Sequence, residues 1–88
     1  MTDIPAIYQG ELKTLDQISV SPLSRAYTFS DSIYEVIPYF SGKPLCFKDH
    51  IDRMKQSASL MDLSINFESV LHDIKQLAST LTNQDGYV

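Results

Sequence analysis

The sequence has little cysteine, little glycine, no tryptophan and no excess of basic residues. Cys46 is the only cysteine, so an intrachain disulfide is excluded and the chain fits a reducing compartment such as the cytoplasm. Seven basic against eleven acidic residues give a net charge of −4, which provides no basic stripe for a phosphate backbone. We therefore expect no nucleic-acid partner. A hydrophobic content of 43% with only three glycines is typical of a globular domain rather than of a repeat or a disordered segment.

Long hydrophobic runs are also missing. The longest mostly apolar stretch, residues 33–40, is interrupted by Glu35 and Pro38, and it is far shorter than the ~20 residues that span a bilayer. The amino terminus, "MTDIPAI", lacks the basic start and the apolar segment of a secretory signal. We therefore expect no membrane partner and a cytoplasmic location. Eighty-eight residues make one domain at most.

Strand signals dominate the first half of the chain. The segment "PAIYQGELK", residues 5–13, predicts two short strands around the turn Gln9-Gly10. Residues 19–32 follow neither the helical nor the strand period, which predicts an irregular connection. Residues 33–40 and 44–47 predict two strands joined by the turn "SGK" as a second hairpin.

The strand predicted over residues 33–40 has two different faces. Alternation places one set of side chains on one face and a second set on the other: Tyr34, Val36, Pro38 and Phe40 against Ile33, Glu35, Ile37 and Tyr39. Both faces are largely apolar, which predicts a strand covered on both sides. A proline cannot donate to the ladder, so Pro38 predicts an edge or a bulge. Cys46, in the following strand, is interpreted as a small buried hydrophobic residue.

Helical periodicity dominates the second half. Apolar residues recur every three or four positions from Phe47 to Met61, which predicts an amphipathic helix. A second helix is predicted from Phe67 to Leu81, with Asn66 as its N-cap. The final "DGYV" predicts a turn and the beginning of another strand. Because the strands are joined by short connections, the sequence predicts a two-layer α+β domain with an antiparallel sheet and two helices.

A basic pair on the first predicted helix is a candidate binding site. His50 and Arg53 are three residues apart and lie on one side of that helix. The guanidinium of Arg53 is suited to a phosphate or a carboxylate. A second interpretation is also open. Asp49 lies four residues before Arg53 and Asp52 lies three residues before Lys55, so these four side chains would form an ordinary solvated ion-pair face.

Glu35 and Tyr34 each allow two interpretations as well. Glu35 is either a general base whose pKa is raised by burial or a carboxylate bound to a nearby cation. Tyr34 is either a donor to a ligand carboxylate or a packing residue with a solvated hydroxyl. His50 and His72 are too far apart in the sequence, and too poorly supported by acids at metal-ligand spacing, so we expect no metal site. The sequence has no glycine-rich phosphate loop, G-x-S-x-G or C-x-x-C motif, so its residues taken singly do not identify a function.

Several segments taken together resemble a known family. Residues 18–61 closely resemble the amino-terminal region of class IV aminotransferases, which depend on pyridoxal 5'-phosphate. The residues that carry the resemblance are Ser21-Pro22 with Arg25, Phe29, Asp31, Tyr34-Glu35-Val36, Gly42-Lys43-Pro44, and His50 with Arg53 in "HIDRM". The form "YEVIP" is most similar to the D-amino-acid aminotransferases. Ser30 and Ser32 depart from the glycines common in that turn.

The resemblance implies a site and a cofactor. It implies that Arg53, with His50 beside it, binds the phosphate of pyridoxal phosphate. It implies that Tyr34 holds the substrate carboxylate and that Val36 and Pro38 line the pocket for the substrate side chain. The substrates would be a D-amino acid and a 2-oxo acid.

The resemblance also sets an expectation for the domain. Residues 1–88 would be most of the amino-terminal domain of a homodimeric enzyme, and the domain that bears the Schiff-base lysine is absent. We therefore expect this chain to be inactive alone. Competing hypotheses are a branched-chain aminotransferase or an aminodeoxychorismate lyase of the same family, or a free-standing module with a binding or assembly role.

Overall fold

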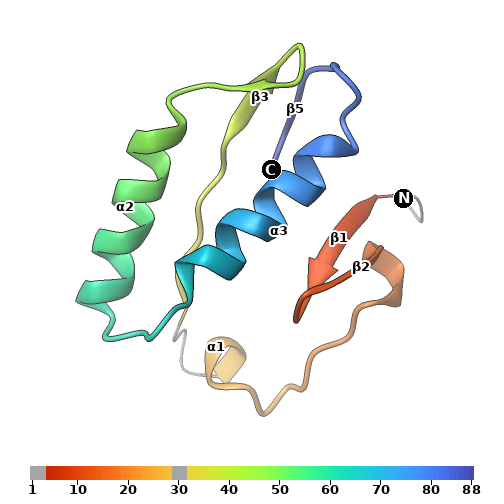
Figure 1. The fold of residues 1–88 in the computed structure, drawn as a ribbon. Coiled ribbons are helices and arrows are strands. Elements are labelled where there is room, and N and C mark those ends of the chain that lie inside the picture. Colours follow the sequence, from red (N-terminus) through yellow and green to blue (C-terminus); the bar gives the residue numbers. More distant parts are fainter. Residues whose placement is uncertain (1–3, 29–31) are drawn as a thin grey trace.

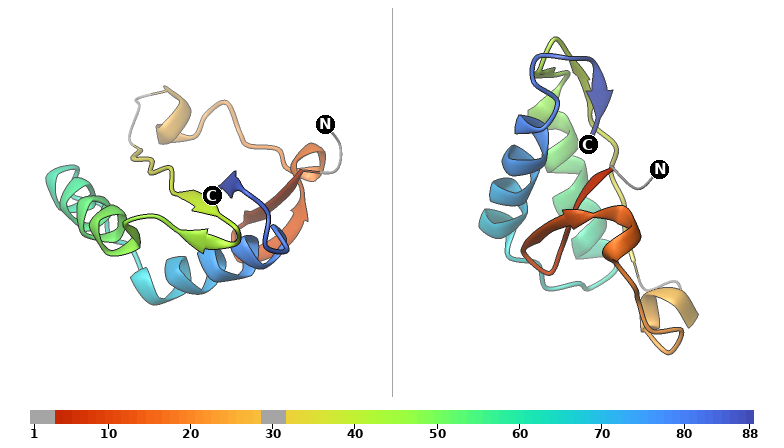
Figure 2. Two further views of the ribbon diagram at one scale, coloured as in Figure 1. Left: turned by 90° about the horizontal axis from the view of Figure 1, so that it is seen from above. Right: turned by 90° about the vertical axis from the view of Figure 1, so that its right-hand side faces the viewer.

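The computed structural model describes residues 4–28 and 32–88, and it confirms the two-layer α+β architecture (Figure 1). Phe29, Ser30 and Asp31, which enter the family resemblance, lie outside the described residues. The elements in chain order are β1 (Pro5–Tyr8), β2 (Glu11–Thr14), a 3-10 turn (Leu15–Gln17), α1 (Arg25–Thr28), β3 (Pro38–Phe40), β4 (Lys43–Pro44), α2 (Phe47–Leu60), α3 (Phe67–Ser79) and β5 (Gly86–Tyr87). Strands β4, β3 and β5 form an antiparallel sheet in that order, and α2 and α3 lie on one side of it (Figure 2).

The predicted first hairpin is confirmed. Strands β1 and β2 pair with Tyr8 opposite Glu11, so the turn consists of Gln9 and Gly10. Both residues have positive φ, 52° and 85°, which is the type I′ geometry that matches the twist of a hairpin. The hairpin forms its own two-stranded sheet, and β1 contacts α3. The segment predicted to be irregular, residues 19–32, contains the single helical turn α1.

The second hairpin is shorter than predicted. Only residues 38–40 of the predicted strand over 33–40 form β3, and the preceding part adds one pair of backbone bonds between Ile37 and Val88, at 2.8 and 3.0 Å. The turn is confirmed at Ser41-Gly42, with φ of 52° and 78°. The predicted strand over residues 44–47 is wrong, because β4 ends at Pro44 and α2 begins at Phe47.

The interpretation of Cys46 as a buried strand residue is also wrong. Its side chain is exposed, and its backbone has the left-handed conformation, with φ of 51°, immediately before α2. The chain must turn from β4 into a helix within two residues, and a left-handed residue produces that change of direction. The thiol is therefore left outside the core.

The position predicted for Pro38 is wrong as well. Strand β3 is the central strand of its sheet, and Pro38 is its first residue, opposite Tyr87. Because Ile37 exchanges both backbone bonds with Val88, the alternation of an antiparallel ladder requires no bond between Pro38 and Tyr87. Toward β4, the Pro38 carbonyl accepts from the Leu45 N–H at 2.9 Å. A central strand accepts the proline because it stands at the first position.

The two predicted helices are confirmed, and they cover the core. The side chains buried between helices and sheet form one cluster: Ile37, Tyr39, Ile51 and Ile74. Asn66 caps α3, since its side-chain oxygen accepts from the Ser69 N–H at 3.3 Å. Within the part of the chain that the structure describes, no helix has the length and apolar character needed to cross a membrane.

The face of the sheet opposite the helices is open. Its large side chains are exposed: Tyr34 by 88%, Val36 by 49%, Phe40 by 55% and Tyr87 by 75%. The prediction that the strand is covered on both sides is therefore wrong for this chain. An apolar composition on both faces does not distinguish a face buried in the core from one that is exposed.

Candidate functional site

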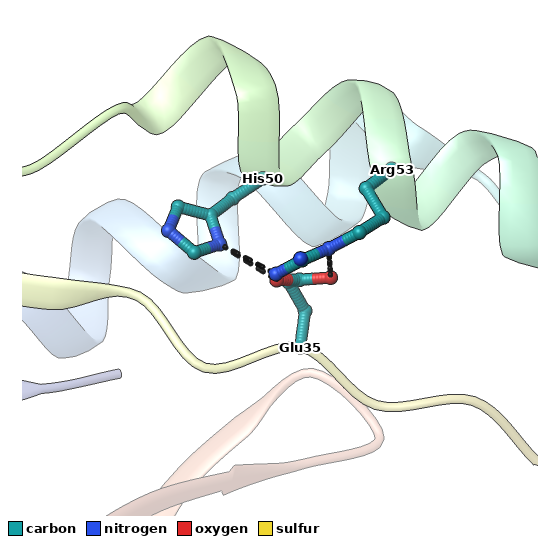
Figure 3. Close-up of polar contacts among 3 residues, drawn as sticks. All are labelled: Glu35, His50 and Arg53. Carbon is teal, nitrogen blue, oxygen red and sulfur yellow. Dashed lines mark hydrogen bonds and ion pairs between the residues drawn. The ribbon is translucent and has the colours of Figure 1, made fainter.

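A cluster of three polar side chains connects the segment before β3 to the first half of α2. Glu35 points toward α2, where His50 and Arg53 meet its carboxylate (Figure 3). His50 Nδ1 lies 2.6 Å from Glu35 Oε1. Arg53 Nε donates to Glu35 Oε2 at 3.1 Å, and Arg53 Nη2 donates to Oε1. The carboxylate thus binds one edge of the guanidinium and the imidazole together.

The local backbone explains why these side chains meet. Alternation along residues 33–40 turns Glu35 to the helix side, the side on which Ile37 and Tyr39 enter the core. His50 and Arg53 lie three residues apart on α2, so they project from adjacent turns of one side. The buried α2 residue Ile51 fixes the helix against the sheet, and this packing sets the distance between strand and helix.

Burial is graded across the cluster. The Glu35 side chain is only 5% exposed and that of His50 is 15% exposed, whereas Arg53 is 64% exposed. Hydrogen bonds from Arg53 and then from His50 lower the pKa of Glu35 from 4.5 to about 2, although burial acts in the opposite direction. The hydrogen bond to Glu35 in turn raises the pKa of Arg53. Glu35 is therefore ionised and bound to a cation, and the general base with a raised pKa is excluded.

The contact distances also define the proton position on His50. The 2.6 Å contact between Nδ1 and the ionised Glu35 requires a proton on Nδ1, because a carboxylate can only accept. Nδ1 then cannot accept from Arg53 Nη2, which lies 3.4 Å away. His50 and Arg53 are consequently two donors to one acceptor, and Nε2 of His50 takes no part in the cluster.

The ion pairs on α2 differ from those that sequence spacing suggested. Arg53 pairs with Glu35, eighteen residues before it, instead of with Asp49. Asp52 pairs with Lys48 at 2.7 Å. The solvated ion-pair face therefore exists for Lys48 and Asp52, while His50 and Arg53 belong to a different, partly buried cluster. No sequence spacing could reveal this, since the partner lies on another element.

A cavity of about 340 Å³ adjoins the cluster. Its lining combines predicted and unpredicted residues: Tyr34, Glu35, Val36, Arg53 and Ser57. Tyr34 and Val36 are thus brought together with Arg53, while Pro38 does not line this cavity. Ser57 was missed by sequence reasoning, although its position four residues after Arg53 places it on the same side of the helix.

The free edge of Arg53 fits an anion such as a phosphate group. A guanidinium has five N–H donors in a planar fork, and Glu35 uses the edge formed by Nε and Nη2. No described residue accepts from Nη1, so the second edge remains available for bidentate binding. Among residues 4–28 and 32–88, no group of three or more histidine, cysteine, aspartate or glutamate side chains is arranged to hold a metal ion.

Comparison with known proteins identifies the family to which this chain belongs. The family model for Amino-transferase class IV matches residues 32–88, which include the whole cluster and most of the fold. The chain therefore belongs to the class IV aminotransferases, and the resemblance inferred from the sequence is confirmed.

Individual relatives are D-alanine aminotransferases. The chain is 33% identical over 79 residues to the enzyme of Listeria monocytogenes serotype 1/2a, covering 90% of this chain and 27% of the relative. It is 30% identical over 79 residues to the enzyme of Staphylococcus epidermidis, with the same two coverages. The enzyme of Listeria innocua is 42% identical over 43 residues, 49% of this chain and 15% of the relative. The chain thus spans about a quarter of the length of the first two relatives.

Proposed function

We propose that residues 1–88 form most of the amino-terminal domain of a D-amino-acid aminotransferase that uses pyridoxal 5'-phosphate. The reaction would exchange an amino group between a D-amino acid and a 2-oxo acid. The relatives named above support the substrate class, since they are D-alanine aminotransferases. The observation that carries the proposal is the Glu35–His50–Arg53 cluster, which orients one edge of a guanidinium and leaves the other edge free beside Tyr34.

In this proposal each residue of the cluster has a distinct role. Arg53 would hold the cofactor phosphate through the free edge of its guanidinium. Glu35 and His50 position Arg53, because the carboxylate is nearly buried and binds both donors. The cofactor, when bound, would supply the electron sink that lets an amino group leave and return.

The substrate would bind on the open face of the sheet. The hydroxyl of Tyr34 donates to the substrate carboxylate, and Val36 and Pro38 form the apolar wall for its side chain. The high exposure of Tyr34 and Val36 supports this placement, because a side chain that contacts a ligand must not be buried in the core of the domain.

The reaction also needs a lysine that binds the cofactor covalently and moves a proton. The cavity at Arg53 contains none of the lysines of this chain, which are Lys13, Lys43, Lys48, Lys55 and Lys75. We infer that a second domain outside residues 1–88 supplies this lysine, in a homodimer located in the cytoplasm. The coverage of about a quarter of each relative supports the existence of such a domain.

The assigned role of Arg53 is tested by comparing two forms of the cofactor. In the intact polypeptide that contains this chain, we expect Arg53→Lys to weaken binding of pyridoxal phosphate by at least about tenfold, because an ammonium cannot form two parallel bonds. Binding of pyridoxal, which lacks the phosphate, should change by less than about twofold. Titration followed by absorbance measures both affinities. Equal losses for the two compounds would contradict a phosphate role for Arg53.

The proposed activity is tested by substrate comparison. The intact polypeptide should transfer the amino group of D-alanine to 2-oxoglutarate, and residues 1–88 alone should give no rate above the blank. Parallel assays with L-leucine and with aminodeoxychorismate separate the branched-chain aminotransferase and the lyase. A cofactor-dependent rate from residues 1–88 alone would contradict the proposal that another domain supplies the lysine.

A further inference from the structure

A second cavity lies away from the Arg53 cluster, at the end of the molecule where the β3–β4 hairpin meets the end of α3. It has a volume of about 460 Å³ and is lined by Tyr39, Gly42, Pro44, Phe47, Lys75, Ala78, Ser79, Thr82 and Asn83. None of these residues lines the cavity at Arg53. Its size lies in the ~300 to 1,000 Å³ range of small-molecule sites. Phe47 lines it from the start of α2, and Lys75, Ala78 and Ser79 line it from α3.

Tyr39 contributes an unpartnered hydroxyl to this cavity. The residue is only 4% exposed, and its hydroxyl forms no hydrogen bond with any other described residue. Every side-chain nitrogen or oxygen sealed from solvent in the described part of the chain has a partner. The phenolic oxygen therefore keeps some exposure to solvent, and Tyr39 lines this cavity. Burial raises the pKa of Tyr39, so the hydroxyl stays protonated and can donate.

Lys75 contributes a cation without an acidic partner. It lines the cavity from α3, and no carboxylate among the described residues forms an ion pair with it. The positions three and four residues away hold Leu71, His72, Ala78 and Ser79, so the helix supplies no acidic neighbour at pairing distance. In a chain with a net charge of −4, an unpaired cation beside an apolar cavity is complementary to an anionic ligand.

We propose that this cavity is a binding site for a small amphipathic carboxylate. Lys75 binds the carboxylate, the Tyr39 hydroxyl donates a hydrogen bond to the ligand, and the apolar part of the ligand packs on Phe47 and Ala78. The site goes beyond the aminotransferase function, because it shares no residue with the proposed cofactor site. It needs neither the cofactor nor a second domain.

Backbone amide NMR of the 88-residue chain tests the proposal with a matched pair of probes. We expect 3-phenylpropionate to produce saturable shifts at Gly42, Ser79 and Asn83. The neutral amide 3-phenylpropionamide, which has nearly the same shape, should bind roughly three- to tenfold more weakly, because it lacks the charge that Lys75 recognises. Equal affinities for the two probes would overturn the proposal.

Three variants separate the cavity from general charge effects. Lys75→Met should weaken binding of 3-phenylpropionate by roughly three- to tenfold, and Tyr39→Phe should weaken it by about two- to fivefold. Lys55→Met is the control, since it removes the same charge from a helix residue outside this cavity, and it should change the affinity by less than about twofold. Circular dichroism checks that the helices persist in each variant.

Three further results would overturn the proposal. Shifts centred on Tyr34 and Arg53 would place the probe at the other cavity. Equal weakening by Lys55→Met and Lys75→Met would show a general charge effect. Shifts at Gly42 and Asn83 that depend on protein concentration without probe would show that a second copy of the chain covers the cavity.

Discussion

The two faces of residues 33–40 share one backbone but have opposite surroundings. On the helix side, Glu35 is bound by two donors, while Ile37 and Tyr39 are 1% and 4% exposed. On the open side, Tyr34 and Val36 are 88% and 49% exposed. Consecutive side chains therefore differ greatly in their exposure and in their contacts. Side chains on the helix side are bound or buried within the domain, whereas those on the open side are exposed, and we propose that the open side binds the substrate.

Under the proposed function, this difference lets one short segment contribute to both stability and substrate binding. The charge of Glu35 lies on the helix side, where Arg53 neutralises it, and Arg53 also lines the cavity that Tyr34 and Val36 line. Residues on the open side are then free to vary with little effect on folding. The comparison leads to three predictions about neighbouring residues with very different expected effects.

The largest effect is expected at the centre of the core. Ile37→Ala should lower the free energy of unfolding by ~3 kcal/mol, because it removes a fully buried side chain and leaves a cavity. That is a large fraction of the ~5–15 kcal/mol typical of a whole domain. Val36→Ala, one residue away, should cost less than ~1 kcal/mol, since Val36 is about half exposed. Urea unfolding measures both, and similar losses would contradict the division between the faces.

An intermediate effect is expected for the charge of Glu35, and it depends on pH. The pKa of Glu35 is about 2 in the folded chain against an ordinary value of 4.5. A lowered pKa means that the stabilisation is complete above about pH 4.5 and is lost as the pH falls toward 2. Urea unfolding at several pH values should show that the wild type loses stability between about pH 4.5 and about pH 2. In Glu35→Gln, most of this pH dependence should be absent.

Asp52→Asn is the matched control for the pH experiment. Asp52 also has a lowered pKa, caused by its hydrogen bond to Lys48, but its side chain is 53% exposed. Pairs exposed in this way contribute little to stability, so Asp52→Asn should preserve most of the wild-type pH dependence. A Glu35→Gln profile that matched the wild type would contradict the inference that the Glu35 cluster is responsible.

The smallest effect is expected on the open side. Tyr34→Phe removes only a hydroxyl from a side chain that is 88% exposed, so the free energy of unfolding should change by less than ~0.5 kcal/mol. Under the proposed function, the same change in the intact polypeptide should raise the KM for D-alanine, because the substrate carboxylate would lose the donor that we assign to Tyr34. Stability and steady-state kinetics together check the prediction. A large loss of stability would place Tyr34 in the packing of the domain.

Local signals in the sequence predicted most of the elements. The spacing of apolar residues identified both helices, Asn66 identified the cap of α3, and the pairs Gln9-Gly10 and Ser41-Gly42 identified the two hairpin turns. Each of these signals lies within one helix or one turn, so it can be recognised in the sequence without knowledge of distant contacts. The family could also be recognised from the sequence, because its motifs are short segments at fixed spacing.

Other features required partners that lie far away along the chain. Sequence spacing suggested Asp49 as the partner of Arg53. In the structure, the packing of the segment before β3 against α2 makes Glu35 the partner of Arg53. The sequence placed Cys46 in a strand, but the short connection into α2 turned it outward. The sequence also predicted an edge or a bulge for Pro38. In the structure, β5 pairs with the second edge of β3, so β3 is the central strand.

The sequence by itself thus determined the helices, the turns and the family, because periodicity, capping and turn conformation are local properties of the backbone. Only the tertiary structure decided which face of residues 33–40 is buried, which acid binds Arg53, and that Tyr39 and Lys75 line one cavity. These features depend on the packing of β3 and the segment before it against α2 and α3, which brings Glu35 to His50 and Arg53, 15 and 18 positions farther along the chain. Contacts at such separations leave no periodic pattern in the sequence.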